Sequence, residues 1–284
     1  QGNNLISFIG LDNDDNSIQS IFNPIQENLT HIFTENYASI FLDDYNDGSW
    51  FGSLDTLESQ RGYWLRLENE DSFEIETYRF IDQDEEIEYS LHYGNNLLSY
   101  ISQDVYSDID DVLPDEVEDL FTDVIGENTS ATRINGEWVG SLANNGLQPL
   151  RGYWFNVAED IDFSYSFSDN LARNNNEIIN TDRLDLPQEF YYNQSQNQAF
   201  YFFKNIRINN IDITNNDWIL GYCNEELVGA RKWFGEYTEV PIMGADEFDE
   251  TRNYCEDDSK VSFKVYQHAT NDIIELYVTV PNWL

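Results

Sequence analysis

The feature that most limits the possible folds of this chain is an internal repeat. Residues 2–8 (GNNLISF) return as residues 94–100 (GNNLLSY), and residues 61–64 (RGYW) return unchanged as residues 151–154. Two further blocks recur between them in the same order: Glu35-Asn36 as Glu127-Asn128, and residues 48–54 as residues 136–142. Self-similarity of this kind fixes the architecture before any local motif does, and it defines two copies of a module of about 90 residues.

The first copy has the pattern of a small α+β module. Residues 5–9 alternate weakly between apolar and polar positions, which predicts a first strand. Ile18, Ile21 and Phe22 then follow at helical spacing until Pro24, which cannot continue a helix. We therefore expect a short helix directly after the first strand.

The second copy departs from the first in this helical region. Ile109, Val112 and Leu113 repeat the helical spacing. An inserted Pro114 is then placed to open a second short helix that carries Val117, Leu120 and Phe121.

Turn residues mark the later strands of each copy. Residues 43–48 and Asn135-Gly136 are turn signals that lead into strands at Trp50 and Trp138. Positions 63, 65 and 67 alternate as one face of a core strand, and positions 153, 155 and 157 do so in the second copy.

The last third of the chain has a different pattern. Residues 168–186 are polar and weakly periodic, as expected of a linker. Five strand candidates follow: residues 200–208, 218–223, 228–233, 261–266 and 273–280. We predict a mainly β chain with short helices, with two tandem α+β repeats followed by a β-sandwich-like domain. The expected divisions are repeat modules at 1–90 and 91–170, a linker at 171–187, and the C-terminal domain at 188–284.

The chain is strongly acidic, with 54 Asp and Glu against 14 Lys and Arg and a formal net charge of -40. Such a surface excludes the cationic footprint that nucleic acids and anionic lipids require. Hydrophobic residues still make up 40% of the chain, too many for a disordered acidic tail. No run reaches the ~18 apolar residues of a membrane span, so no membrane insertion is expected. We expect a folded protein that needs salt, divalent cations or a cationic partner to offset self-repulsion.

Both cysteines, Cys223 and Cys255, lie in the C-terminal third. A disulfide that closes a loop of about 30 residues fits this placement, and two free thiols are the alternative. Metal ligation would need more Cys or His nearby. The start at Gln1 without a methionine is what a secreted protein shows after signal removal, and a trimmed chain would look the same.

Several of these segments resemble known modules. Residues 4–8, 50–54 and 61–64 resemble repeats found in large secreted proteins of marine bacteria. The C-terminal segment looks like a β domain often found beside such repeats, through four stretches: residues 217–221, 228–231, 240–244 and 261–266. The resemblance implies an extracellular or cell-surface multidomain protein, and it brings no catalytic residues with it.

Carboxylates cluster at two places. Asp12, Asp14 and Asn16 have the alternating oxygen spacing with which calcium loops begin, although Ser17 and Asn23 replace the glycine and glutamate of an EF-hand. The second cluster spans residues 246–258 and includes Asp246, Asp249 and Asp257. We expect Ca²⁺ at such positions, and solvated acidic turns are the alternative.

Tryptophan raises the question of sugar recognition, because exposed aromatic faces stack on sugar rings. Four tryptophans recur at matched positions of the repeats and are expected to serve the fold: Trp50, Trp64, Trp138 and Trp154. Trp218 and Trp233 lie outside the repeats and are candidates for glycan contact.

No catalytic motif stands out in the sequence. It contains no Gly-x-Ser-x-Gly, no His-Glu-x-x-His and no phosphate loop, and its many carboxylates single out no glycosidase pair. We therefore expect a secreted protein that is not an enzyme. It would be a structural or adhesive subunit of an extracellular, cell-surface or filamentous assembly, binding copies of itself or other surface proteins. The alternative is a carbohydrate-binding module that attaches a cell or a larger enzyme to polysaccharide.

Overall fold

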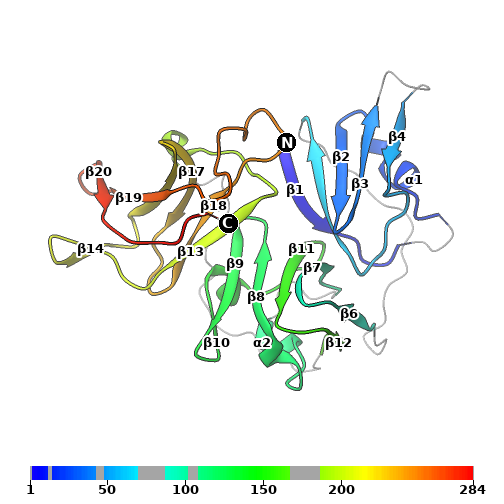
Figure 1. The fold of residues 1–284 in the computed structure, drawn as a ribbon, viewed down its shortest axis with the longest axis horizontal. Helices are drawn as coiled ribbons and strands as arrows, with labels where there is room; N and C mark the ends of the chain where they lie inside the picture. Colours follow the sequence, from blue (N-terminus) through cyan, green and yellow to red (C-terminus); the bar gives the residue numbers. More distant parts are fainter. Residues whose placement is uncertain are drawn as a thin grey trace. The chain divides into compact units, whose positions relative to one another are not determined.

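The computed structural model describes residues 2–11, 15–42, 48–69, 87–101, 108–166 and 186–283. The chain forms two compact units: residues 1–127, 131–138 and 142–177 in the first, and residues 128–130, 139–141 and 178–284 in the second. The first unit holds nearly all of both repeats, drawn in blue to green in Figure 1. The second holds the C-terminal domain, drawn in yellow to red, and two short segments of the second repeat. The fold is mainly β with short helices, as predicted.

The first repeat is a five-stranded antiparallel sheet in the order β1-β5-β2-β3-β4, with a short helix. Its elements are β1 (Gly2–Ser7), α1 (Ile18–Phe22), η1 (Asn23–Ile25), β2 (Leu29–Thr34), β3 (Tyr37–Leu42), β4 (Ser49–Gly52) and β5 (Gly62–Leu67). The side chain of Ser17 accepts a hydrogen bond from the Ser20 N–H and so caps α1, whose Ile18, Ile21 and Phe22 are buried. The predicted helix is confirmed.

The second repeat has the same strand arrangement, β7-β11-β8-β9-β10. Its elements are β7 (Gly94–Ser99), α2 (Ile109–Val112), η2 (Glu118–Leu120), β8 (Phe121–Gly126), β9 (Thr129–Ile134), β10 (Glu137–Val139), α3 (Ser141–Asn145) and β11 (Gly152–Val157). A separate pair joins β6 (Tyr89–Leu91) to β12 (Ile161–Phe163). The helix expected to open at Pro114 is only the 3₁₀ turn η2, which begins at Glu118 and ends at Leu120, because Phe121 opens β8 and is fully buried.

Within the first unit the two repeats contact each other through equivalent residues. The Ser7 N–H donates to the Leu150 carbonyl (3.0 Å), and the Ser99 N–H donates to the Gln60 carbonyl (3.1 Å). A Cβ added to Gly62 would lie 3.1 Å from the Cα of Gly152, and the reverse is also true. Each RGYW block therefore packs on the other, and only glycine permits this approach.

Two glutamates reinforce the same pairing. Glu127 Oε2 accepts a hydrogen bond from the Leu5 N–H (3.0 Å), and Glu35 Oε2 accepts one from the Leu97 N–H (3.3 Å). Leu5, Leu97 and Trp64 form a small buried cluster between the repeats, with Trp154 packed against it. Contacts that are reciprocated by equivalent residues are those of a pseudo-two-fold pair. The repeated sequence blocks thus encode this interface as well as each module.

The second unit is built of two β layers. A four-stranded antiparallel sheet has the order β17-β16-β19-β20, and a strand pair β13-β18 packs on it. The strands are β13 (Gln198–Phe203), β14 (Arg207–Ile208), β15 (Ile211–Asp212), β16 (Trp218–Cys223), β17 (Glu226–Lys232), β18 (Thr238–Met243), β19 (Val261–Gln267) and β20 (Asp272–Leu276), preceded by η4 (Gln188–Phe190). A Cβ on Gly229 would lie 1.6 Å from the Pro241 carbonyl oxygen, so the layers approach closely only at glycine.

Several strand expectations need correction in this unit. The strand expected over residues 200–208 is divided into β13 and β14, and the last strand ends at Leu276 rather than at Val280. β18 was not predicted, because Pro241 within it argues against a strand. It is tolerated because β18 pairs only with β13 in the described part of the chain. The expected linker at 171–187 falls almost entirely outside the described residues.

Candidate functional site

Exposed apolar side chains gather on β4, an edge strand of the first repeat, and on its neighbour β3. Ile40 and Leu42 on β3 are 38% and 41% exposed, and Phe51 on β4 is 38% exposed. Ile40 pairs directly with Phe51, and Leu42 lies two residues further along β3, so all three lie on one face of the sheet. We call these three residues the repeat-1 strip. His31 of β2 pairs with Ile40, and Arg66 of β5 pairs with His31, so the three residues lie in one row across the sheet.

A second exposed region lies at the edge of the C-terminal sheet. β20 is the last strand of this sheet and pairs with β19. Ile273 is 52% exposed and Tyr277, directly after the strand, is 95% exposed. Alternation places Glu275 on the same side, while Ile274 and Leu276 turn inward and are half-buried. We call Ile273, Glu275 and Tyr277 the β20 face.

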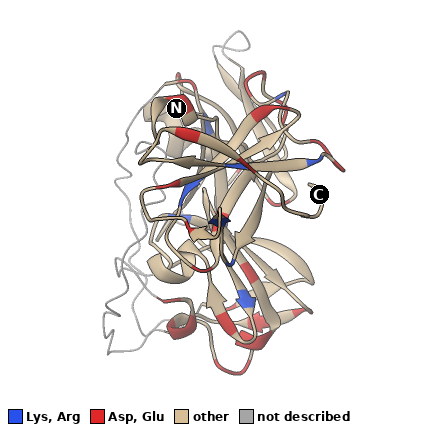
Figure 2. Cartoon of the chain, turned by 90° about the vertical axis from the view of Figure 1, so that its left-hand side faces the viewer, with Lys and Arg blue, Asp and Glu red and all other residues tan. Residues whose placement is uncertain are grey.

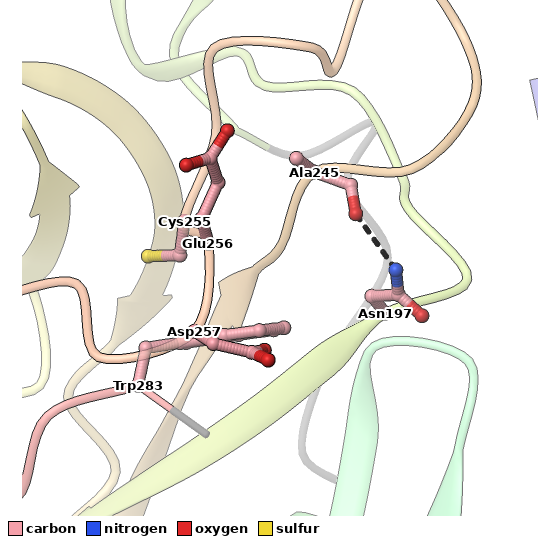
Figure 3. Close-up of a pocket in the computed structure, with 6 residues that line it drawn as sticks. All are labelled: Asn197, Ala245, Cys255, Glu256, Asp257 and Trp283. Atoms are coloured by element: carbon pink, nitrogen blue, oxygen red, sulfur yellow. Dashed lines mark hydrogen bonds between the residues drawn. The ribbon is translucent and has the colours of Figure 1, made fainter.

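The second unit also has a polar cavity of about 620 Å³, shown in Figure 3. Its lining residues are Asn197, Ala245, Cys255, Glu256, Asp257 and Trp283. The Asn197 amide donates to the Ala245 carbonyl (2.7 Å), and the Trp283 indole N–H donates to the Ile242 carbonyl (3.2 Å). The exposed carboxylates of Glu256 and Asp257 supply acceptors at its rim. These lining groups suit the binding of hydroxyls, and they include no histidine or serine.

An ion pair is buried in the second unit. Arg231 of β17 and Glu239 of β18 lie 3.3 Å apart and are 3% and 0% exposed. The Glu239 carboxylate also accepts hydrogen bonds from the N–H and hydroxyl of Ser141, and the Arg231 guanidinium donates to the Asn128 carbonyl (2.5 Å). Burial raises the pKa of Glu239, although Arg231 and Ser141 oppose the rise. The pair thereby fixes segments 128–130 and 139–141 to the C-terminal strands.

Only part of the expected calcium ligand set lies within the described residues. Asp12 and Asp14 lie outside the described residues, and Asn16 precedes α1 with its side-chain oxygen enclosed and without a hydrogen bond in the described structure. Asp246 accepts hydrogen bonds from the Phe248 N–H and the Thr251 hydroxyl, Asp249 pairs with Arg252, and Asp257 lines the cavity. Among the described residues, no group of three or more His, Cys, Asp or Glu is placed to hold a metal ion.

The candidate glycan contacts are not open ring faces. Trp233 is only 9% exposed and lies in the core of the second unit, and Trp218 is half-buried against the same core. Of the repeat tryptophans, Trp64 is 1% exposed between the repeats. Cys223 and Cys255 form the disulfide that the sequence predicted.

Two features of these surfaces could have been found in the sequence. Residues 37–42 (YASIFL) are apolar on both faces of the strand, which is typical of a strand covered on both sides. Arg231 and Glu239 each interrupt an apolar strand, and a charge at such a position indicates a buried partner.

No helix in the described ranges is both long and apolar enough to cross a membrane. Comparisons of the chain with protein-family models, with curated proteins and with solved structures gave no match.

Proposed function

We propose that this protein is a non-catalytic, secreted building block of an extracellular or cell-surface assembly, held together by contacts between its own copies. The observation that carries the proposal is the repeat-1 strip. Exposed apolar patches bordered by polar residues mark sites of protein contact. Phe51 of the strip lies on β4, the edge strand of the sheet, where a further β element can be received.

The charge of the chain sets the condition under which copies associate. Asp and Glu are spread over loops and strands throughout Figure 2, and Lys and Arg are few. Copies with a net charge of -40 repel one another at low salt. Salt shortens the range of this repulsion to about 10 Å at 0.1 M, and divalent cations act in the same direction. Apolar contacts between copies then decide whether the copies associate.

The disulfide agrees with the proposed location, because such bonds persist in oxidising, extracellular compartments.

Static light scattering of the wild-type protein tests the proposal. The apparent molar mass should rise with protein concentration in NaCl or CaCl₂ and should rise less at low ionic strength. A protein that scatters as a monomer at every concentration, salt and calcium level contradicts the proposed function.

A specific observation favours the second candidate, binding to polysaccharide. The polar cavity has a volume within the range of ligand sites and is bordered by Asn197, Glu256 and Asp257. In affinity electrophoresis through polysaccharide gels, Asp257→Asn should weaken retention. Asp212→Asn, an exposed site at the β14–β15 hairpin, is the matched control and should not. Equal mobility of wild type and Asp257→Asn in every gel rejects the cavity as the site.

A further inference from the structure

Residues 277–283, which follow β20 in the second unit, end in a buried tryptophan. Trp283 is 7% exposed and belongs to the core of this unit. Its ring packs directly on Gly244, where an added Cβ would overlap the ring. The indole N–H of Trp283 donates to the Ile242 carbonyl (3.2 Å), and its backbone N–H donates to the Ser259 carbonyl (2.9 Å). We call the surface formed by Gly244, Ile242 and Ser259 the Trp283 site.

The residues between β20 and Trp283 have few contacts, and Figure 1 draws them in red. Tyr277 is 95% exposed. Residues 278–280 make no hydrogen bond in the described part of the chain. The Tyr201 hydroxyl donates to the Pro281 carbonyl (3.2 Å), so the next polar contact lies only shortly before Trp283. Trp283 is therefore the main anchor of this segment.

The sequence of this segment is that of a strand, although the structure leaves it unpaired. Residues 277–280 (YVTV) are all aromatic or β-branched, which favours a strand. The last strand nevertheless ends at Leu276, and residues 277–280 have no partner strand in the described chain. Residues 276–284 also carry no charged side chain, in a chain with a net charge of -40. Two copies can therefore approach each other here with little local repulsion.

We propose that residues 277–283 exchange between two copies of the chain. Trp283 of each copy occupies the Trp283 site of the other, and the two 277–280 stretches pair as antiparallel strands. This inference rests on the proposed function and names its first step, the formation of a dimer. The repeat-1 strip then supplies contacts between dimers. The occupant fits the site because it is the same segment that the site already holds within one chain.

The new strand pair supplies the free energy that favours the exchanged state. The contacts of Trp283 are the same before and after exchange, so they cancel, and exchange of an identical element is a low-cost route to a dimer. Pairing gives the backbone groups of residues 278–280 protein partners. It also covers apolar area of Tyr277 and Val278, which are 95% and 43% exposed in the single chain.

Two complementary variants test the exchange. The anchor variant, Trp283→Ala, keeps the site and lacks the side chain that fills it. The site variant, Gly244→Ala, keeps Trp283 and blocks its site, because the added Cβ overlaps the ring. Neither variant can exchange with itself. In a mixture, Trp283 of the site variant can enter the open site of the anchor variant.

Sedimentation velocity gives the readout, in saline buffer and at the lowest protein concentration at which the wild type forms a dimer. The anchor variant and the site variant should each sediment as a monomer when alone. An equimolar mixture of the two should regain a dimer. A purely structural role of Trp283 predicts no recovery on mixing, so the mixture distinguishes exchange from loss of stability.

A second pair of variants leaves Trp283 and its site intact. Thr279→Asp places a carboxylate in the proposed strand pair, where its burial is unfavourable. Thr270→Asp adds the same charge at the exposed turn between β19 and β20 and is the matched control. Both should keep the wild-type melting temperature. Thr279→Asp should lose the dimer at a concentration at which Thr270→Asp retains it.

The outcomes separate the exchange from the proposed function. If the wild type forms a dimer and the anchor or site variant does so equally well, or if their mixture stays monomeric, the exchange is wrong while the assembly function stands. Equal dimerisation of Thr279→Asp and Thr270→Asp has the same meaning, and this pair decides if the anchor or site variant fails to fold. If the wild type is monomeric in all conditions, the proposed function fails and this inference fails with it.

Discussion

Arg231 and Glu239 show how single residues hold a unit together. Both are enclosed, and each also binds a segment of the second repeat, Glu239 through Ser141 and Arg231 through Asn128. A buried ion pair offsets the cost of desolvation only if its remaining hydrogen bonds are satisfied. Removal of either partner leaves an uncompensated charge in the interior.

We therefore expect Glu239→Gln to lower the free energy of unfolding by about 3 kcal/mol, the cost of breaking a buried pair. Urea unfolding at neutral pH measures it. Glu236→Gln is the matched control, since the Lys204–Glu236 pair is exposed and should contribute little. Equal stability of the two variants would show that the buried pair does not fix the segments.

A second residue contact links the repeats. His92 Nε2 lies 2.5 Å from Glu35 Oε1, and His92 Nδ1 lies 2.8 Å from the Tyr93 carbonyl oxygen. Both ring nitrogens face acceptors, so the protonated imidazolium is favoured. The hydrogen bond to Glu35 raises the pKa of His92 above its usual value.

NMR titration should therefore place the pKa of His92 above 6.5 in the wild type and lower in Glu35→Gln. Glu127→Gln is the matched control, because Glu127 pairs with Arg151 in the equivalent position and does not contact His92. A His92 pKa that Glu35→Gln leaves unchanged contradicts the contact.

The sign of the linked stability follows from this rise. A folded-state pKa above the unfolded value gives a stabilisation that is fully present below about pH 6.5 and is lost as pH rises through the folded pKa. The His92 side chain is 58% exposed, so solvent screening keeps the contribution small.

Among the elements, β5 packs closely on β11 because Gly62 and Gly152 lie where the two strands meet. Gly62 has no positive φ, so glycine is needed there for space: an added Cβ would lie 2.8 Å from Leu97 and 3.1 Å from Gly152. Gly94 has the reverse requirement, with φ at +95° and nothing within 4 Å of an added Cβ.

Gly62→Ala should cost about 1–3 kcal/mol by overpacking and should expose Trp64. Gly94→Ala is the matched control, because it adds only backbone strain of about 1–2 kcal/mol and no contact near Trp64. Thermal unfolding followed by tryptophan fluorescence measures both effects. A Gly62→Ala protein with wild-type emission and melting temperature would rule out the close contact.

The disulfide joins the end of β16 to the segment after β18 within the second unit. Cross-links of this loop length stabilise by about 2–4 kcal/mol. Reductant should therefore lower the melting temperature of the wild type and leave a Cys223→Ser, Cys255→Ser variant unaffected. The same response of both proteins would mean that the bond does not stabilise the fold.

Sequence pattern predicted those features that depend only on residues near one another in the chain or in one domain. The α1 helix followed from apolar spacing and Pro24, and the disulfide followed from two cysteines in one domain. β18 was not predicted, because Pro241 within it argues against a strand. All six of its residues are buried, so packing of the domain stabilises the strand despite the proline. The end of η2 was misplaced because burial of Phe121 in the core, not propensity, makes it the first residue of β8.

Less of the candidate site could be predicted. The strip needs the register of β3 with β4, which brings Ile40 beside Phe51, and no sequence pattern supplies that register. Trp233 shows a residue that the sequence suggested for the site and the structure buries. A tryptophan outside the repeats suggested sugar contact, but Trp233, directly after β17, lies in the core. Repeat symmetry was the useful guide, because equivalent residues of the two copies make the reciprocal contacts between the repeats.

For the whole molecule, two opposing terms decide its behaviour. In the proposed assembly, net charge would keep copies apart, and the exposed apolar surfaces would draw them together once salt screens the charge. The repeats close on each other within the chain, so growth of an assembly has to use the outer surfaces. The protein should therefore be monomeric at low ionic strength and associated in a saline medium.

The most direct test is the molar mass of the wild-type protein in 0.5 M NaCl, measured by size-exclusion chromatography with multi-angle light scattering over a wide range of loaded concentrations. The account predicts a mass that increases with concentration beyond the 33.2 kDa of one chain, and that returns to this value at low salt. A mass that stays at one chain at every concentration would contradict it.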